Sequence, residues 1–242
     1  MALPKLEVPT YELELPLSKK KIKFRPFLVK EQKNLLMAME SGDATTIQNN
    51  VRDILDVCTL TPGVDVDELP IIDIEYYFLQ LRAKSVGELV DLRYRCNNDV
   101  EGKECGNIME TKYDLNNIKV QQEEQVSPEI QLNERLTVKF KYPQFGMVKS
   151  SMMYDDVADL TFNLIAQSID WVFDGEQYYY GHEQTTQELL EFIESLNQEQ
   201  FQKIEKFFAN LPKMKKKIGI TCSKCGFIHN MEVEGLENFF AF

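Results

Sequence analysis

Four of the five cysteines form two pairs that lie far apart in the chain, and this spacing constrains the fold more than any other feature. Cys222 and Cys225 form a CxxC motif followed by Gly226, as in a zinc knuckle. There, two thiolates bind one metal ion and the glycine adopts a turn that directs backbone N–H groups at the sulfurs. A thioredoxin-like redox motif would instead have a long helix after the cysteines. Strand-like sequence flanks this motif on both sides, so the pattern favours a metal-binding turn.

The other pair is Cys96 and Cys105, which are separated by eight residues rather than the usual two to four. Gly106 follows this pair, and strand-like sequence flanks it too, so the two pairs form a weak internal repeat. The repeat predicts a zinc ribbon, in which two hairpins share one structural zinc ion bound by Cys96, Cys105, Cys222 and Cys225. Iron is an alternative, because four thiolates accept both metals, and unpaired buried thiols are the alternative to any metal.

A metal ion at this site would close a loop of more than a hundred residues between Cys105 and Cys222. The binding free energy of a structural zinc ion is folding free energy, so its loss is expected to destabilise the protein. Four thiolates leave no coordination position for water. We therefore expect the metal to be structural and not catalytic.

The remaining candidates for chemistry are few. Cys58 falls on the apolar face of a predicted helix, where a lone cysteine is a small core residue. His182 and His229 are predicted to be surface or core residues. His229, four residues after Cys225, could replace a cysteine as a metal ligand, but four cysteines already suffice. The sequence has no GxGxxG, P-loop, HExxH or GxSxG motif. Three carboxylates gather at a predicted helix start, where negative charge favours the helix dipole: Asp155, Asp156 and Asp159. We expect no enzymatic activity.

The chain is acidic, with a formal net charge of −12 at pH 7. Proteins that bind nucleic acid present a basic surface, because contacts to phosphate supply most of the affinity. Two basic clusters, at 19–23 and 213–217, are each predicted to be a solvated turn beside a strand, so no nucleic-acid contact is expected. The apolar runs are shorter than the ~20 residues of a membrane-spanning helix. Residues 1–5 do not have the pattern of a secretory signal.

The periodicity predicts an α+β fold, in which helical units combine with β-hairpins and with a zinc-ribbon-like module of four cysteines formed by sequence-distant halves. We predict three units. Residues 1–88 form an N-terminal hairpin and helical unit. Residues 89–120 and 213–242 form the zinc-ribbon-like module, and residues 121–212 form an inserted strand and helical unit.

The elements within these units follow from local patterns. Alternating residues predict strands at 11–15, 22–27, 89–96, 108–115, 136–142, 217–221 and 228–233, and a hairpin at 171–180 around Asp174-Gly175. Helical spacing predicts helices at 29–41, 43–58, 72–84, 155–172, 185–195 and 198–210. A polar linker is predicted at 121–129, and a break is predicted at Pro143.

Several segments carry a family resemblance: Leu-Pro-Lys-Leu-Glu-Val-Pro-Thr at 3–10, Phe-Arg-Pro-Phe at 24–27 and Cys-Ser-Lys-Cys-Gly at 222–226. The chain resembles the baseplate hub proteins of T4-like bacteriophages over most of its length. The resemblance implies a structural or assembly protein of the central hub of a contractile tail, without enzymatic activity. It implies other hub proteins as partners, and a location in the virion or in the host cytoplasm during assembly. A stable subunit and a transient assembly factor both fit it.

Two further hypotheses stay open beside this one. A zinc-ribbon module that binds nucleic acid or acts in transcription would use the basic clusters and bind in a salt-sensitive way. A metal-dependent hydrolase would need an open coordination position, and changing Cys222 to serine would then abolish activity without unfolding the chain. Candidate interaction surfaces are the tyrosines at 178–180 and the segment 237–242, whose three phenylalanines dock either on their own domain or on a partner.

Overall fold

The chain alternates short antiparallel sheets with helices, so the predicted α+β class is confirmed. The computed structural model describes residues 7–122, 124, 126–151 and 156–234, and the phenylalanine-rich segment 237–242 lies outside the described residues. The elements follow in this order: β1 (Tyr11–Glu14), β2 (Lys21–Phe24), α1 (Val29–Ser41), α2 (Ala44–Cys58), α3 (Ile71–Val86), β3 (Leu89–Arg95), β4 (Asp99–Val100), β5 (Lys103–Glu104), β6 (Ile108–Asp114), η1 (Leu115–Asn117), β7 (Val120–Gln121), β8 (Glu129–Gln131), β9 (Thr137–Phe140), α4 (Phe145–Ser151), α5 (Val157–Gln167), β10 (Ile169–Phe173), β11 (Tyr178–Tyr180), η2 (Gly181–Glu183), α6 (Thr186–Glu194), α7 (Gln198–Ala209), β12 (Lys213–Thr221) and β13 (Ile228–Glu234).

The N-terminal hairpin β1–β2 packs on helices α1, α2 and α3 around the first hydrophobic core. Helix α1 ends at Gly42, whose φ of 67° is the left-handed conformation that glycine favours at a helix C-terminus. The carboxylate of Asp43 accepts a hydrogen bond from the N–H of Thr46 and so caps α2. These local signals confirm the predicted bounds of the first two helices. The main buried residues of this core are Leu15, Ile22, Phe24, Leu35, Leu55, Cys58, Ile74, Tyr77, Phe78 and Leu81.

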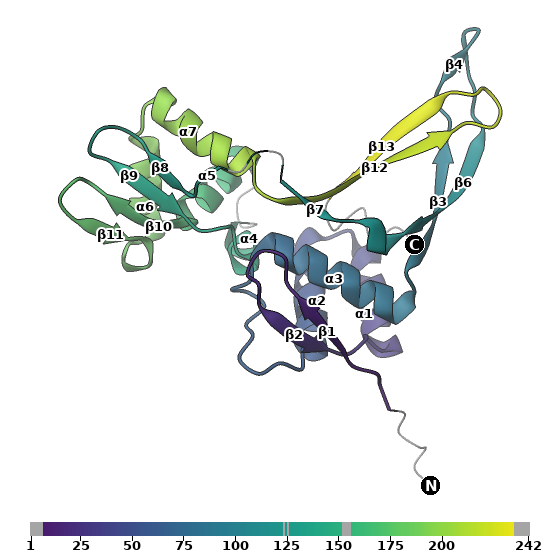
Figure 1. Ribbon diagram of the computed structural model, residues 1–242, viewed down its shortest axis with the longest axis horizontal. Helices are drawn as coiled ribbons and strands as arrows, with labels where there is room; N and C mark the ends of the chain where they lie inside the picture. The colour runs from purple at the N-terminus through teal and green to yellow at the C-terminus, as the bar shows by residue number, and fades with distance from the viewer. Residues whose placement is uncertain (1–6, 123, 125, 152–155, 235–242) are drawn as a thin grey trace.

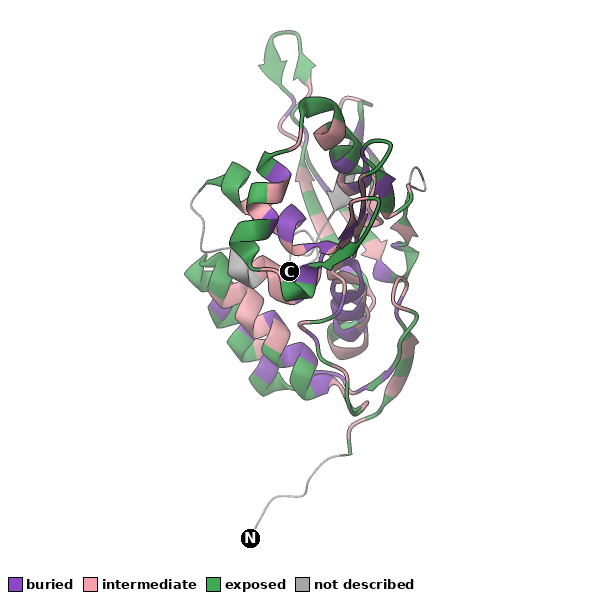
Figure 2. Cartoon of the chain, turned by 90° about the vertical axis from the view of Figure 1, so that its left-hand side faces the viewer, coloured by how far each residue is buried: buried purple, intermediate pink, exposed green. Residues whose placement is uncertain are grey.

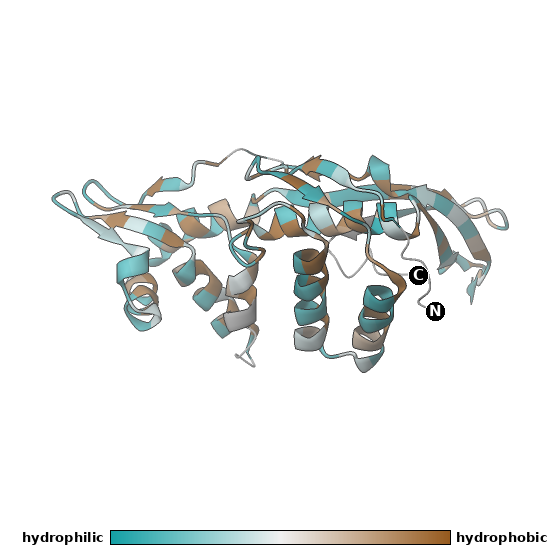
Figure 3. Ribbon diagram, turned by 90° about the horizontal axis from the view of Figure 1, so that it is seen from below, coloured by the Kyte–Doolittle hydropathy of each residue, from teal (hydrophilic) through white to brown (hydrophobic). Residues whose placement is uncertain are grey.

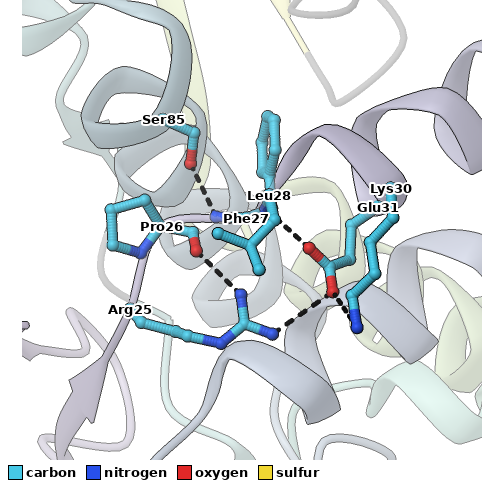
Figure 4. Close-up of polar contacts among 7 residues, drawn as sticks. All are labelled: Arg25, Pro26, Phe27, Leu28, Lys30, Glu31 and Ser85. Atoms are coloured by element: carbon cyan, nitrogen blue, oxygen red, sulfur yellow. Dashed lines mark hydrogen bonds and ion pairs between the residues drawn. The ribbon is translucent and has the colours of Figure 1, made fainter. Parts of the chain in front are cut away.

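A buried carboxylate fixes the turn from β2 into α1, as Figure 4 shows. Glu31 accepts a hydrogen bond from the N–H of Leu28 at 2.6 Å and so caps the first turn of α1. The Arg25 guanidinium lies 3.3 Å from the same carboxylate. Ser85, in α3, accepts a hydrogen bond from the N–H of Phe27 at 3.0 Å. Polar contacts therefore hold β2, α1 and α3 together in addition to the hydrophobic core.

The inserted part of the chain is built on a four-stranded antiparallel sheet of order β11-β10-β9-β8. Helices α5, α6 and α7 pack against one face of this sheet. Reciprocal capping boxes begin α6 at Thr185 and α7 at Asn197, so these two predicted helices are confirmed. The core between sheet and helices consists mainly of Ile130, Val138, Phe140, Ile165, Val172, Leu189, Ile193, Ile204 and Phe207.

The helix predicted for 155–172 is wrong after Gln167. Helix α5 ends at Gln167, and both the N–H and the hydroxyl of Ser168 donate to the carbonyl of Leu164. Ile169–Phe173 is strand β10, which pairs with β9 on one side and with β11 on the other. Apolar residues in this stretch fit both periods, and the β-branched and aromatic residues after Ser168 favour the strand once partners exist on both sides. The hairpin predicted around Asp174-Gly175 is confirmed.

Helix α4 and strand β8 are two of the short elements that were not predicted. Helix α4 follows the predicted break at Pro143, and strand β8 begins at the end of the predicted linker 121–129. Helix α4 is held from outside its own sequence, because the N–H groups of Phe145 and Gly146 donate to the carbonyls of Leu69 and Asp67, each at 2.9 Å. Long-range contacts of this kind leave no local sequence pattern.

The basic cluster at 213–217 lies inside strand β12, so its prediction as a solvated turn is wrong. Strand β12 pairs with β13 along most of its length and with β7 at its start. The register places Lys215 opposite Glu234 and Lys217 opposite Glu232. The other basic cluster, at 19–23, spans the turn before β2 and the first residues of that strand.

The molecule is elongated, with strands β3, β6, β12 and β13 at one end and the β8–β11 sheet at the other (Figure 1). Helix α3 and the rest of the N-terminal unit lie between these ends. Most helices project to one side of the molecule (Figure 3), with inward faces buried and outward faces exposed (Figure 2). A further core joins α3 to the ribbon strands through Ile72, Leu79, Ala83, Val90, Leu115, Ile118 and Met214. Among the described residues, no helix combines the length and the apolar character needed to cross a membrane.

Asp73, in the first turn of α3, offers a test of how the hairpin is attached. Its carboxylate is fully buried and accepts the N–H groups of Leu17 and Ser18, each at 2.8 Å. Asp73→Ala leaves these two backbone donors without their acceptor, so we expect the free energy of unfolding to fall by about 2–3 kcal/mol in denaturant titrations. Asp91→Ala is the matched control, because the Asp91 side chain is 83% exposed. It should change the free energy by less than about 0.5 kcal/mol. Equal effects of the two substitutions would contradict this account.

Candidate metal centre

The four predicted cysteines, which come from distant parts of the chain, meet at one point. Their Sγ atoms all lie within 4.8 Å of one another: Cys96, Cys105, Cys222 and Cys225. The Sγ atoms of Cys96 and Cys225 are 3.6 Å apart, and those of Cys105 and Cys222 are 3.8 Å apart. A tetrahedral zinc ion with Zn–S bonds of about 2.3 Å requires S···S distances of about 3.8 Å. A disulfide requires about 2.05 Å, so these sulfurs are free thiols, and the distances within these two pairs are close to those around one tetrahedral ion.

The second cysteine pair has the backbone of a metal-binding turn. The N–H of Cys222 donates to the carbonyl of Phe227 at 2.8 Å, and the N–H of Gly226 donates back to the carbonyl of Cys222 at 2.9 Å. Gly226 has a φ of 73°, which a residue with a side chain rarely adopts. The glycine therefore closes the turn between β12 and β13 and leaves both thiols on the same side.

The first pair repeats these hydrogen bonds. The N–H of Cys96 donates to the carbonyl of Asn107 at 2.8 Å, and the N–H of Gly106 donates to the carbonyl of Cys96 at 2.9 Å. Gly106 has a φ of 64°. The weak repeat seen in the sequence thus corresponds to two turns with the same backbone connections, one after β3 and one after β12.

The six additional residues of the first turn (eight between the cysteines, against two in the second) form a hairpin of their own, β4–β5. Its two-residue turn has positive φ at both positions, 56° at Glu101 and 82° at Gly102, as in a type I′ turn. At its base, the N–H of Cys105 donates to the carbonyl of Asn98 at 2.8 Å. The hairpin therefore closes on itself and returns Cys105 to the cluster.

The environment of the thiols differs from one cysteine to another. N–H groups of Cys225 and Lys224 are directed at Cys222 and lower the pKa of its thiol to about 6. The side-chain amide of Asn107 adds a donor 3.5 Å from the same sulfur. Burial raises the pKa of Cys96 to about 12. The Cys222 thiol therefore loses its proton more readily than the Cys96 thiol, and a bound metal ion would deprotonate the other thiols.

Three polar side chains around the cluster were not predicted as part of it. His229 is buried, and its Nε2 lies 3.1 Å from Cys96 Sγ. The side-chain amides of Asn98 and Asn107 approach Cys225 and Cys222. For the asparagines the available signal was their position beside the cysteine turns, and for His229 it was the alternation of β13, which directs it inward. His182 is exposed and lies beside Glu183.

The other candidates lie apart from the cluster. Cys58 is buried at the end of α2, where burial raises the pKa of its thiol to about 11, so it is an unreactive core residue as predicted. Asp156 caps α5 by accepting a hydrogen bond from the N–H of Ala158, which agrees with its predicted role at a helix start. Asp155 lies outside the described residues.

Comparison with known proteins gives one match. A protein-family model described as T4 bacteriophage base plate protein matches residues 8–241. No curated protein and no solved structure matches the chain significantly. The matched range includes both cysteine turns and nearly the whole chain. The chain therefore belongs to the T4 bacteriophage base plate protein family.

Proposed function

We propose that this chain is a structural or assembly protein of the central hub of a contractile-tail baseplate. Family membership supports a structural role in the baseplate, contacts with other baseplate proteins and a location in the virion tail. The assignment to the hub rests on the resemblance carried by 24–27 and 222–226. Presence in the host cytoplasm during assembly and the absence of enzymatic activity belong to the same proposal.

The proposed cofactor is one structural zinc ion bound by Cys96, Cys105, Cys222 and Cys225. The observation that carries this proposal is the convergence of the four Sγ atoms, which all lie within 4.8 Å of one another, with two pairs 3.6 and 3.8 Å apart. Two of the sulfurs come from the turn after β3 and two from the turn after β12, so the ion would join two hairpins. Zinc has no redox chemistry, and four thiolates leave it no open position, so its role would be to fix this geometry.

The proposed division of the chain is supported by three of its four hydrophobic cores, whereas the core around Ile72 and Met214 joins the first unit to the metal-binding module. Residues 1–88 would form the first unit, 89–120 with 213–242 the metal-binding module, and 121–212 the insertion. The first and second cores support the first and third units. The cluster around the cysteines, with Met109 and Ile220, supports the metal-binding module.

The surface proposed for hub contacts is the strand Tyr178–Tyr180. This strand lies at the edge of its sheet, and all three tyrosine side chains are exposed. Tyr178 and Tyr180 stack with ring centroids 6.3 Å apart, and Tyr178 also contacts the ring of Trp171 at 5.1 Å. Tyrosine and tryptophan are enriched at protein interfaces, so this aromatic surface suits a protein partner. The alternative of nucleic-acid binding is weakened by the formal net charge of −12.

Metal content tests the zinc proposal. We expect about one zinc ion per chain by elemental analysis of protein purified without added metal. Cys222→Ser should lose most of the zinc and lower the free energy of unfolding by at least ~4 kcal/mol, a fraction of the ~10–16 kcal/mol that zinc contributes in small zinc fingers. Cys58→Ser is the matched control, because Cys58 is equally buried but belongs to another core, and it should keep the zinc. Folded wild-type protein that contains no metal and four freely titratable thiols would refute the zinc site.

Fractionation of infected cells tests the hub proposal. We expect a tagged chain to co-purify with baseplate hub proteins, while a tag without the chain does not. Detection in finished tails would identify a stable subunit, and detection only in assembly intermediates would identify an assembly factor. Absence from both, together with salt-sensitive retention on DNA, would replace the hub assignment by the nucleic-acid hypothesis.

A further inference from the structure

The two cysteine turns differ in the backbone donors that reach their first cysteine. Cys222 receives the N–H of Cys225, the second cysteine of its own turn. Cys96 holds the equivalent position and receives the N–H of Asn98. The N–H of Cys105, which is the counterpart of Cys225, instead donates to the carbonyl of Asn98 at 2.8 Å. The inserted hairpin β4–β5 therefore diverts a donor that the other turn directs at its sulfur.

A histidine lies beside Cys96 Sγ, the sulfur that does not receive this backbone N–H. His229 in β13 is only 5% exposed, and its Nε2 lies 3.1 Å from Cys96 Sγ. Its ring is held by Tyr94 and Phe227, with ring centroids 4.9 and 4.8 Å away. The equivalent residue of the first turn, four positions after Cys105, is Met109, whose side chain has no N–H to donate. The imidazole thus comes from the second hairpin and faces Cys96 Sγ, the sulfur that the N–H of Cys105 does not reach.

We propose that His229 is a positioning residue of the metal centre, whose Nε2–H donates to Cys96 Sγ in place of the backbone N–H diverted by the inserted hairpin. This inference rests on the proposed metal site. The donation requires the tautomer with its proton on Nε2. A hydrogen bond to a thiolate draws negative charge away from sulfur and orients its lone pairs, so it stabilises the metal-bound thiolate against protonation and attack.

The same contact could serve packing alone, and two substitutions separate the roles. His229→Phe keeps an aromatic ring between Tyr94 and Phe227 and removes the donor. His229→Gln removes the ring and keeps an N–H at similar reach. A positioning role predicts that the glutamine variant resembles the wild type, whereas a packing role predicts that the phenylalanine variant does.

The first readout is the transfer of zinc from the loaded protein to a chromogenic chelator at neutral pH. We expect His229→Phe to release zinc about tenfold faster than the wild type, the lower limit for loss of a residue that supports a metal ligand. His229→Gln should stay close to the wild-type rate. Alkylation with iodoacetamide, mapped by mass spectrometry, should modify Cys96 earlier in His229→Phe than in the wild type.

The second readout is the spectrum of protein loaded with Co²⁺ in place of zinc. A thiolate that loses a hydrogen bond is richer in electrons, so the sulfur-to-cobalt charge-transfer band of His229→Phe should move to longer wavelength. Asn230→Ala is the control, because Asn230 is the next residue of β13 and is exposed. This variant should leave the spectrum and the release rate unchanged.

The outcomes separate the inference from the proposed metal site. If His229→Phe binds about one zinc ion, releases it at the wild-type rate and has the wild-type Co²⁺ spectrum, the proposed role of His229 is overturned and the proposed metal site is not. Changes as large in His229→Gln as in His229→Phe would also overturn it, because the retained N–H would then fail to restore the wild-type behaviour. A change in His229→Gln alone would overturn it in favour of packing. A wild-type protein that contains no zinc would overturn both the metal site and the role of His229. The zinc content of the wild type is measured before any variant is compared.

Discussion

The meeting of four thiols at one point is the interaction on which the arrangement of the chain depends. Cys105 and Cys222 are 117 residues apart, and the two hairpins that carry the cysteines belong to separate sheets among the described residues. No backbone ladder joins β3 or β6 directly to β12 or β13 there, so side chains make the contact between the two cysteine turns. The apolar part of this contact is small: Met109, Ile220, Tyr94 and Ile218. A metal ion shared by the four sulfurs would therefore supply the main cross-link, and its binding free energy would count as folding free energy.

The charge of such a centre must be balanced inside the protein. Four thiolates and one divalent cation leave two negative charges. Three of the four cysteines, Cys96, Cys105 and Cys222, are buried. Burial of charge is unfavourable unless donors surround it. The chain supplies them from both sides of the cluster: N–H groups of the turns at Cys222, side-chain amides of two asparagines, and the imidazole of His229. These donors compensate the charge, while the surrounding apolar side chains keep water from the sulfurs. Both effects suit a centre that must keep its geometry for the lifetime of a particle.

The cross-link also constrains the insertion. The chain enters this part after β7 and leaves it before β12, and these strands pair at Val120 and Met214. Beside that ladder lies an apolar groove of about 380 Å³, lined by residues of all three parts of the chain, among them Ile72, Leu164 and Met214. The side-chain packing between the insertion and the rest of the chain is thus incomplete. The short β7–β12 ladder therefore makes an important part of the contact between them. Anything that fixes the far end of β12 also fixes the direction in which the insertion leaves the ribbon.

The elements that were predicted correctly are those marked by local signals, such as cap and turn residues. Gly42 and Asp43 mark a helix end and a helix start by side-chain chemistry alone, and the glycines after both cysteine pairs mark the turns, so these elements and the cysteine cluster were predicted correctly. The strand β10 was mistaken for helix because its apolar residues fit either period, and only its neighbours in the sheet select one. His229 is an intermediate case. Strand alternation after Cys225 leaves Ile228 58% exposed and directs the next residue, His229, inward. This alternation can be read from the sequence. The sulfur that this residue meets depends on how the second hairpin packs on the first, and this is a property of the folded chain.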